Sequence, residues 1–327
     1  MSVKERLGMF VIVLCIFISC SKEDAPVPTQ YLMASEFNGN PKLSIYSAGS
    51  GKVEEISLNE ISSNSKILDI LLVPKGLFII LTTGIQLLNP IDWSLVNSGL
   101  YAFPDLSYIA YSKGIVYVAT YENGFSYLRT YDENTLALID NQLIGPVQVY
   151  ALMVTKNRIF ISYDQTILVL DADLFGKVGE LELTNICATL LGNSQNDILV
   201  FFENRCTIIF NSESKVSNFT LPGAQTLSTT SLRPSAVIDR ETDILYYFQT
   251  QTGSSQLVLT SFDLRRNTPQ GISPGYFAGE GIFFDQKSKH ILLTALSGRV
   301  TVIDVNGKLV ENIDIPGRPL KIVSKFN

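Results

Sequence analysis

The sequence has few of the residues that enzymes most often use at their active sites. Its 327 residues include one histidine, His290, and one tryptophan, Trp93. A single histidine allows neither a histidine-based metal site nor a Ser-His-Asp triad. We therefore expect no catalytic residues and no cofactor. His290 begins an apolar segment after a lysine-rich turn, and we expect it at the surface.

Cysteine is scarce as well, and its placement argues against disulfides. Two of the four cysteines, Cys15 and Cys20, lie in the first twenty residues, which leaves Cys187 and Cys206. We expect these two on strands of one sheet with another strand between them. Their backbones would then be roughly 9–10 Å apart, beyond the reach of a disulfide. The sequence predicts two buried free thiols.

Charge and long apolar runs are also limited. Charged residues make up 17% of the chain and hydrophobic residues 46%. After residue 20, no apolar run approaches the ~20 residues that a membrane-spanning helix needs, and no long helical period appears. Many short apolar runs without a long one indicate strands that are buried on both faces.

The first thirty residues have the pattern of a secretion signal and an anchor. A charged start at Lys4, Glu5 and Arg6 is followed by the apolar stretch 7–18 and by Ile18-Ser19-Cys20. We interpret residues 1–19 as a signal peptide and residues 20–30 as an anchored cysteine with its tether. The sequence at 18–20 resembles the lipobox of bacterial lipoproteins, which implies acylation of Cys20. The alternative is an ordinary signal peptide with an incidental cysteine.

The residues after Cys20 bear on localisation and partners. Ser21-Lys22-Glu23-Asp24 resembles the charged run of outer-membrane lipoproteins displayed on the cell surface. This implies a lipid anchor in the outer membrane and exposure at the surface, with a periplasm-facing anchor as the alternative. Removal of residues 1–19 changes the net charge from −6 to −7. That charge argues against nucleic acid as a partner.

One short pattern recurs seven times: an apolar segment, a polar turn that usually contains glycine, and a second apolar segment. Successive turns lie 45, 40, 41, 40, 48 and 45 residues apart, ending at Gly39, Gly84, Gly124, Gln165, Arg205, Gly253 and Gly298. This period suits a four-stranded propeller blade. We predict an all-β, seven-bladed β-propeller over residues 31–327. A two-sheet sandwich, the alternative, does not require so regular a period.

One blade can be written out in full, and the chain ends complete another. The strands of that blade are expected at 149–154, 158–163, 166–171 and 177–183. Beyond six such units the chain has one C-terminal strand at 320–326 and three N-terminal strands at 31–36, 42–47 and 53–58. An open ring would expose sheet edges. We therefore expect these four strands to form the seventh blade, with the C-terminal strand innermost.

Residue types divide between the two faces of the predicted disc. The charged face carries the turns between first and second strands and between third and fourth strands, with lysines such as Lys113 and Lys156. The aromatic face carries the turns between second and third strands and the connections between blades. Aromatic residues interleaved with arginine are typical of recognition surfaces. The candidate ligand-binding residues on this face are Tyr101, Phe103, Tyr108, Tyr121, Phe125, Tyr150, Tyr163, Arg205, Arg233, Tyr276, Phe277 and Arg318.

Packing and acidic residues also bear on the aromatic face. We expect about half of its aromatic residues to be buried as packing residues. Acidic residues also recur where second strands end, at Glu36, Glu122, Asp164 and Glu203. Carboxylate oxygens around a channel mouth are ligands that Ca²⁺ accepts, so a cation site there is an open alternative.

Anchor, length and blade count together resemble the seven-bladed, YVTN- or WD40-like propellers of bacterial surface lipoproteins. That group includes proteins that capture vitamin B12 or a siderophore and pass it to a TonB-dependent transporter. The resemblance implies a non-catalytic protein that captures a small or medium-sized ligand on its aromatic face, and we expect a monomer. Alternatives are a platform for protein partners at the outer membrane and a cation-dependent hydrolase or lactonase. The lone Trp93 weakens any resemblance to quinoprotein dehydrogenases, whose blades repeat a tryptophan motif.

Overall fold

The computed structural model describes residues 30–48, 50–56, 65–187, 189–195, 197–202, 205–209, 216–221, 223–225, 233–250, 257–271 and 279–325. The predictions for the signal peptide, Cys20, the tether, Glu203, Tyr276 and Phe277 lie outside these residues. Nowhere in the described ranges is there a helix long and apolar enough to cross a membrane.

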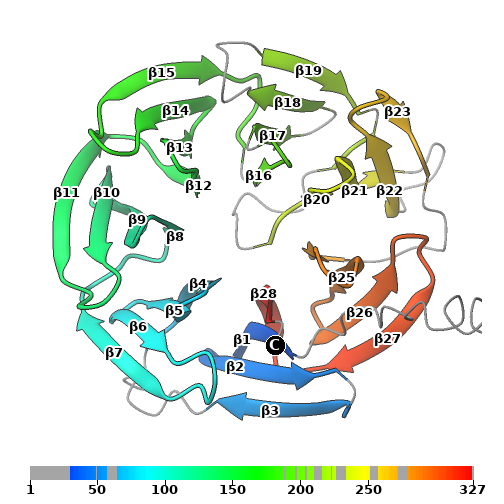
Figure 1. Ribbon diagram of the computed structural model, residues 1–327, viewed down its shortest axis with the longest axis horizontal. Helices are drawn as coiled ribbons and strands as arrows, with labels where there is room; N and C mark the ends of the chain where they lie inside the picture. The colour runs from blue at the N-terminus through cyan, green and yellow to red at the C-terminus, as the bar shows by residue number, and fades with distance from the viewer. Residues whose placement is uncertain are drawn as a thin grey trace, which may run out of the picture.

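The described strands form seven antiparallel sheets of four strands each, arranged in a ring (Figure 1). This confirms the predicted seven-bladed β-propeller. Blades 1 to 6 follow one another along the chain, and the closing blade joins the two chain ends. Blade 1 contains β4 (Ile67–Val73), β5 (Gly76–Leu81), β6 (Gly84–Leu88) and β7 (Leu95–Leu100); blade 2 contains β8 (Ser107–Ser112), β9 (Ile115–Glu122), β10 (Phe125–Asp132) and β11 (Leu138–Gly145); blade 3 contains β12 (Val149–Val154), β13 (Arg158–Tyr163), β14 (Thr166–Asp171) and β15 (Lys177–Glu182).

The other blades have the same order of strands from the centre outward. Blade 4 contains β16 (Thr189–Gly192), β17 (Ile198–Phe202), β18 (Arg205–Ile209) and β19 (Val216–Thr220); blade 5 contains β20 (Ala236–Asp239), β21 (Ile244–Thr250), β22 (Leu257–Asp263) and β23 (Thr268–Pro269); blade 6 contains β24 (Gly281–Asp285), β25 (His290–Thr294), β26 (Arg299–Asp304) and β27 (Leu309–Asp314); the closing blade contains β28 (Arg318–Lys325), β1 (Gln30–Phe37), β2 (Asn40–Ser47) and β3 (Lys52–Ile56).

The closing blade has the predicted composition. β28 pairs antiparallel with β1, from Gln30 opposite Lys325 to Glu36 opposite Arg318, and β2 and β3 follow outward. Polar contacts also hold β28 to both neighbouring blades. Lys321 Nζ donates to the carboxylate of Asp69 in blade 1, and Ser324 Oγ donates to Asp285 Oδ1 of blade 6 at 3.5 Å.

Alternate residues of a strand point to opposite faces of its blade and pack against the two neighbouring blades. In β5, Leu77, Ile79 and Leu81 pack toward the closing blade. Phe78 and Ile80 of the same strand pack toward blade 2. The described residues contain seven such apolar clusters, one at each interface around the ring. Burial on both sides explains the near-continuous apolar runs of the sequence.

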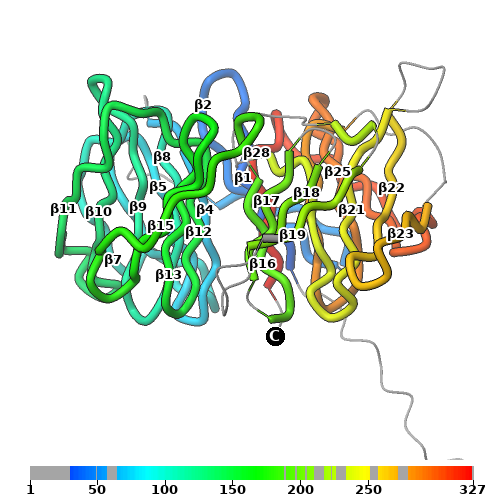
Figure 2. Tube along the Cα trace, turned by 90° about the horizontal axis from the view of Figure 1, so that it is seen from above, coloured from blue at the N-terminus to red at the C-terminus, as the bar shows by residue number. Residues whose placement is uncertain are grey.

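Those recurrent turns of the sequence that lie within the described ranges are on one face of the ring. Asn38-Gly39 and Asn123-Gly124 connect second to third strands, and all four residues have φ between 51° and 84°. Two-residue hairpins with this backbone favour Asn-Gly because both positions need a positive φ. In Figure 2 the ring is seen from its side, with the β1–β2 turn on one face and the C-terminal end of β28 on the other. The first of these is the aromatic face and the second is the charged face.

The structure adds detail to four of the residues singled out in the sequence. Cys187 and Cys206 are buried free thiols, as predicted, although Cys187 lies just before β16 and not within it. Trp93 is a packing residue, with Lys325 Nζ 4.8 Å from its ring centre. His290, expected at the surface, is half-buried, with Nδ1 3.4 Å from the Tyr31 hydroxyl.

Candidate functional site

Three of the inner strands, β4, β12 and β28, are irregular where they begin, at the mouth of the channel on the aromatic face. In the β4–β5 pairing, Ile67 lies opposite Leu81 and Asp69 opposite Ile80, so Leu68 is an extra residue. Tyr150 is the corresponding extra residue in β12, and Leu320 in β28. A β-bulge bends its strand and redirects a side chain. Three blades therefore have a displaced side chain at the same level of the mouth.

A tyrosine sector occupies the part of this mouth formed by blades 2 and 3. It consists of Tyr108 on β8, Tyr121 at the end of β9, Tyr150 on β12 and Asp164 in the β13–β14 turn. β12 packs against both β8 and β9, which brings these strands together. Burial, Asp164 and Tyr121 raise the pKa of Tyr150, in that order. Burial, Asp69 and Tyr150 likewise raise the pKa of Tyr108.

The hydroxyl groups of this sector have few partners. Tyr108 is 2% exposed, and its buried hydroxyl has no hydrogen-bond partner in the described part of the chain. Tyr121 and Tyr150 are half-buried, and their hydroxyls make no hydrogen bond to the described part of the chain. Buried polar groups without a partner are rare in native proteins, and each calls for an explanation. The hydroxyl groups of the tyrosine sector therefore have hydrogen-bonding positions that the described residues do not fill.

An arginine sector lies across the mouth, at the start of blades 5 and 6 and of β28. Arg318 Nε and Nη2 donate to the two carboxylate oxygens of Glu280 at 2.7 and 2.6 Å. Arg233 Nη1 lies 3.6 Å from the same carboxylate. The bidentate bond to Glu280 raises the pKa of Arg318, whereas burial, followed by the nearby Arg318, lowers the pKa of Arg233. One carboxylate is thus shared by two guanidinium groups.

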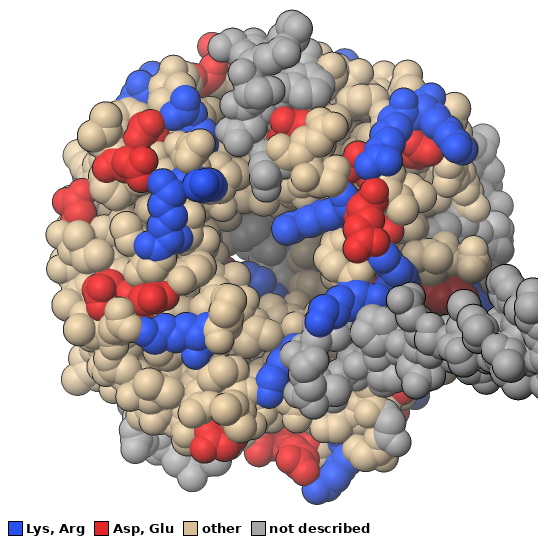
Figure 3. Space-filling model, in the orientation of Figure 1, with Lys and Arg blue, Asp and Glu red and all other residues tan. Residues whose placement is uncertain are grey.

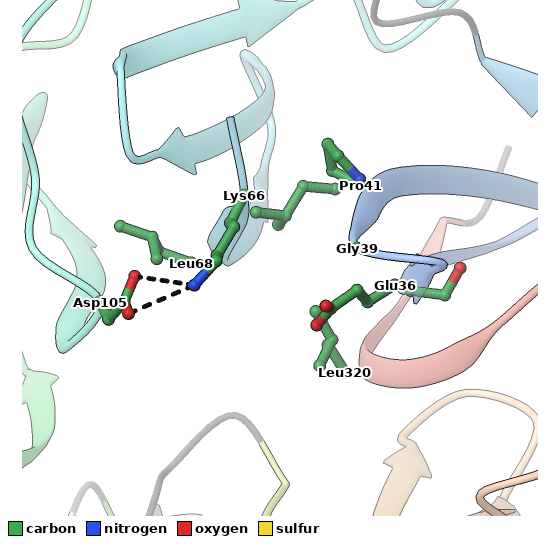
Figure 4. A pocket seen from close by; sticks show the side chains of 9 residues that line it. Glu36, Gly39, Pro41, Lys66, Leu68, Asp105 and Leu320 are labelled. Atoms are coloured by element: carbon green, nitrogen blue, oxygen red, sulfur yellow. Dashed lines mark hydrogen bonds and ion pairs between the residues drawn. The ribbon is translucent and has the colours of Figure 1, made fainter. Parts of the chain in front are cut away.

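A pocket of about 140 Å³ lies between the closing blade and blade 1 (Figure 4). Leu320, Leu68 and Ile67 form its apolar lining, and Glu36 and Lys66 lie at its polar edge. Lys66 Nζ is 3.3 and 3.4 Å from the oxygens of Asp105, and both side chains are exposed. The extra residues Leu320 and Leu68 therefore shape this pocket. The pocket therefore has an apolar wall beside the oppositely charged side chains of Lys66 and Asp105.

Several predicted binding residues have packing roles. Phe103 is 5% exposed and lies in the cluster between blades 1 and 2, so it offers little surface to a ligand. Tyr101 packs on Phe103 and Tyr131, and its hydroxyl donates to the Leu136 carbonyl at 2.7 Å. Tyr163 donates to Glu180 Oε1 at 3.0 Å, with its pKa raised to about 12 chiefly by burial. Of the seven described aromatic candidates, only Phe103 and Tyr108 are buried, and Tyr101 and Tyr163 are half-buried with hydrogen bonds inside the protein.

The remaining predicted residues are exposed or lie outside the described ranges. Phe125 is 41% exposed at the start of β10, and Arg205 is exposed at the start of β18. The structure thus brings Tyr108, Tyr121 and Tyr150 together on one side of the mouth, and Arg233 and Arg318 on the other. Phe125 and Arg205 belong to neither sector.

Those carboxylates considered as cation ligands that lie within the described ranges, Glu36, Glu122 and Asp164, do not form a metal-binding group. Glu36, Glu122 and Asp164 belong to the closing blade, blade 2 and blade 3. Glu122 is paired with Arg129, whereas Asp164 has no ion pair among the described residues. No group of three or more His, Cys, Asp or Glu residues within the described ranges is arranged to hold a metal ion.

Three charged residues near the mouth were missed by the sequence reasoning: Asp69, Glu280 and Lys321. Asp69 offered a signal, because it is a lone carboxylate in the apolar run Ile67–Val73. It is 2% exposed and accepts hydrogen bonds from the Ile70 and Ile109 amides at 2.8 and 3.0 Å. Glu280 and Lys321 gave no comparable signal, because each lies in a segment that mixes polar and apolar residues.

The charged face differs in character. Figure 3 looks onto it and shows Lys and Arg of several blades around the channel opening, with Asp and Glu beside them. Many of these charges are paired, as in Lys113 with Asp173 at 2.9 Å and Lys289 with Asp239 at 2.8 Å. β1 begins on this face, because Gln30 pairs with Lys325 at the end of β28. The described chain therefore starts on the side opposite the tyrosine and arginine sectors.

No family model matches the chain, and no curated protein matches it in sequence. Solved structures share its fold. A quinonprotein alcohol dehydrogenase-like protein from Bacteroides thetaiotaomicron has a TM-score of 0.69 at 11% identity, over 92% of this chain and 79% of that one. Hydrazine synthase from Kuenenia stuttgartiensis has a TM-score of 0.61 at 12% identity, over 79% of this chain and 90% of that one. Apo AztD from Citrobacter koseri has a TM-score of 0.55 at 13% identity, over 90% of this chain and 97% of that one. At these identities the similarity shows the propeller fold alone.

Proposed function

We propose that the chain is a non-catalytic capture protein that binds a small or medium-sized ligand at the channel mouth on its aromatic face. The observation that carries this proposal is the tyrosine sector, where hydroxyls without a hydrogen-bond partner among the described residues lie beside aromatic rings and the exposed carboxylate of Asp164. Ligand sites combine apolar and aromatic surface with a few convergent polar groups. The arginine sector and the pocket beside Leu320 extend this surface around the mouth.

The proposal includes an anchor and a direction. Acylation of Cys20 would tether the propeller to the outer membrane, with a TonB-dependent transporter as the recipient of the ligand. β1 begins on the charged face, so a tether leaving it starts on the side away from the tyrosine sector. Ten extended residues reach at most about 33–36 Å. In its default pose the aromatic face would then point away from the anchoring membrane, which suits capture.

The anchor has its own test. Replacement of Cys20 by Ser removes the thiol that would be acylated and leaves every described strand unchanged. We expect metabolic labelling with a fatty acid to mark the parent protein and not Cys20→Ser, while both melt at the same temperature. Equal labelling of the two proteins would rule out the anchor.

Native mass spectrometry of the protein after exposure to a nutrient mixture tests ligand capture. The parent should retain a ligand, and the Tyr121→Ala/Tyr150→Ala variant should lose it. The matched control, Lys113→Ala/Lys156→Ala, changes two residues on the opposite face and should keep the ligand. Loss in the lysine variant with retention in the tyrosine variant would place the site on the wrong face. A parent that retains no ligand would contradict capture.

A second function, docking of a protein partner, is favoured by the turns between second and third strands. Phe37, Phe125 and Leu296 are 47%, 41% and 64% exposed at such turns in three blades. An exposed apolar side chain at the corresponding turn of three blades offers a partner several points of contact on one face. If a partner co-purifies, replacing these three residues by Ser should release it and leave ligand capture intact.

A further inference from the structure

We propose that a pocket on the rim of the ring, between blades 4 and 5, binds an uncharged saccharide. The pocket is separate from the channel mouth, so this inference goes beyond the proposed function and does not depend on it.

The outermost strand of blade 5 is short. β23 has two residues, whereas the outermost strands of the other six blades have five to eight. Its second residue, Pro269, has no amide hydrogen with which to continue the ladder. Within the described ranges, only Phe262 and Asp263 of β22 pair with it. Blade 5 therefore lacks most of the outer strand that the other blades have.

A pocket of about 480 Å³ lies beside this short strand. In Figure 1, β19 of blade 4 is next to β22 and β23 of blade 5. Phe219 on β19 lines the pocket from blade 4, and its ring meets that of Phe262 edge-on with centroids 6.1 Å apart. Tyr247 and Phe262, 2% and 4% exposed, form its deepest part. Small-molecule sites have volumes of about 300–1,000 Å³. This pocket has that size, whereas the pocket beside Leu320, at about 140 Å³, is smaller.

The lining of the pocket is polar without being charged. None of the described residues that line it is Lys, Arg, His, Asp or Glu. The side-chain amides of Gln249 and Asn267 make no hydrogen bond to the described part of the chain, and neither does the Tyr247 hydroxyl. Each amide offers both donors and an acceptor. An ion bound here would lose water without gaining a counter-charge, so the pocket favours a neutral ligand that donates and accepts hydrogen bonds.

A sugar ring has the shape and the groups that this arrangement needs. Hydroxyls surround the ring, each able to donate and accept, and one face of the ring presents C–H groups. The half-buried Phe219 offers an apolar surface to that face. Gln249 on β21 and Asn267 before β23 offer amides from two different segments. A purely apolar ligand would cover these amides without bonding them, which costs free energy.

A glycan microarray that carries neutral and acidic glycans tests the ligand class without assuming one sugar. The full chain should be applied in a polyoxyethylene detergent, because alkyl-glycoside detergents would compete for the site. We expect binding to neutral glycans. Calorimetric titration with a bound neutral oligosaccharide then gives the Kd for the parent and its variants.

Gln249→Leu keeps the size of the side chain and removes its hydrogen-bonding groups. It should weaken binding of that oligosaccharide by about fivefold, the size expected for the loss of one or two hydrogen bonds. Gln165→Leu is the matched control, because it makes the same change at an exposed turn of blade 3. Its Kd should equal that of the parent. Both variants should melt at the parent's temperature, since neither glutamine side chain is hydrogen-bonded within the described residues.

Three results would overturn the inference: no glycan bound by the parent, binding confined to acidic glycans, or equal effects of Gln249→Leu and Gln165→Leu. The proposed function is judged separately by native mass spectrometry. A glycan that is lost from the Tyr121→Ala/Tyr150→Ala variant and retained by Gln249→Leu would lie at the channel mouth. That result would reject the saccharide site on the rim and leave the proposed function intact.

Discussion

At the scale of single residues, buried charge does more to organise the channel mouth than the aromatic residues that mark it in the sequence. Asp69 is 2% exposed inside an apolar strand, yet it binds two backbone amides and the Lys321 ammonium. These bonds join three inner strands: β4, β8 and β28. Asp69 therefore fixes the relative positions of the strands that present Leu68, Tyr108 and Leu320.

Loss of Lys321 would leave this carboxylate buried without its counter-charge. Breaking a buried pair from one side costs about 3–5 kcal/mol, whereas an exposed pair contributes at most about 1 kcal/mol. We predict that Lys321→Met lowers the free energy of unfolding by about 3 kcal/mol in urea denaturation. The matched Lys42→Met, which breaks the exposed pair with Glu55, should cost less than about 1 kcal/mol. Equal effects of the two substitutions would contradict the role of Lys321 as the counter-charge of Asp69.

At the scale of strands and blades, the sequence was sufficient for the architecture. The blade expected at 149–183 has the predicted strand boundaries to within one residue, and the closing blade has the predicted strand order. Both results follow from local signals: Asn-Gly turns that need positive φ, and apolar runs that need cover on both faces.

The site was less accessible to sequence reasoning, for a physical reason. The extra residues Leu68, Tyr150 and Leu320 shift the register of inner strands, and a one-residue shift decides which side chain leaves the sheet. An apolar run carries no mark of such a shift. Burial of Phe103 and exposure of Phe125 likewise depend on the neighbouring blade.

β28 is the strand on which ring closure depends, since it pairs with β1 and contacts blades 1 and 6. Deletion of residues 318–327 exposes unpaired backbone on β1 and removes the Lys321 and Ser324 contacts. We predict a loss of several kcal/mol from a total of about 5–15 kcal/mol, seen as aggregation or a much lower melting temperature. Deletion of residues 326–327 alone, beyond the last strand, should have little effect. A parent-like melting temperature after the longer deletion would contradict closure by β28.

At the scale of the whole molecule, radial packing places many tyrosines at interfaces between blades. Burial, helped by neighbouring Glu311, raises the pKa of Tyr46 to about 12, and burial beside Cys206 raises that of Tyr247 to about 12. Burial also raises the pKa values of Tyr31, Tyr131 and Tyr246. The folded protein therefore keeps these phenols protonated at a pH where the unfolded chain, with tyrosine pKa values of about 10, releases the protons.

This difference makes stability depend on alkaline pH. Below about pH 10 both states are protonated, and the stabilising contribution is fully present. As the pH rises from about 10 to about 12, the unfolded state binds fewer protons than the folded state, so the free energy of unfolding falls. We predict that the urea midpoint decreases steadily over this range, and that ultraviolet titration shows delayed ionisation of several tyrosines in the folded protein. A midpoint independent of pH across the range would contradict this burial.

The central claim is that a captured ligand lies at the tyrosine sector of the channel mouth. Hydroxyl-radical footprinting, with and without a ligand recovered by the protein, measures the exposure of individual tyrosines and so tests the claim most directly. Tyr121 and Tyr150 should be protected by the ligand, whereas Tyr111, half-buried at the charged-face end of β8, should react equally in both samples. Protection of Tyr111 without protection of Tyr121 and Tyr150 would place the ligand on the opposite face and contradict the account.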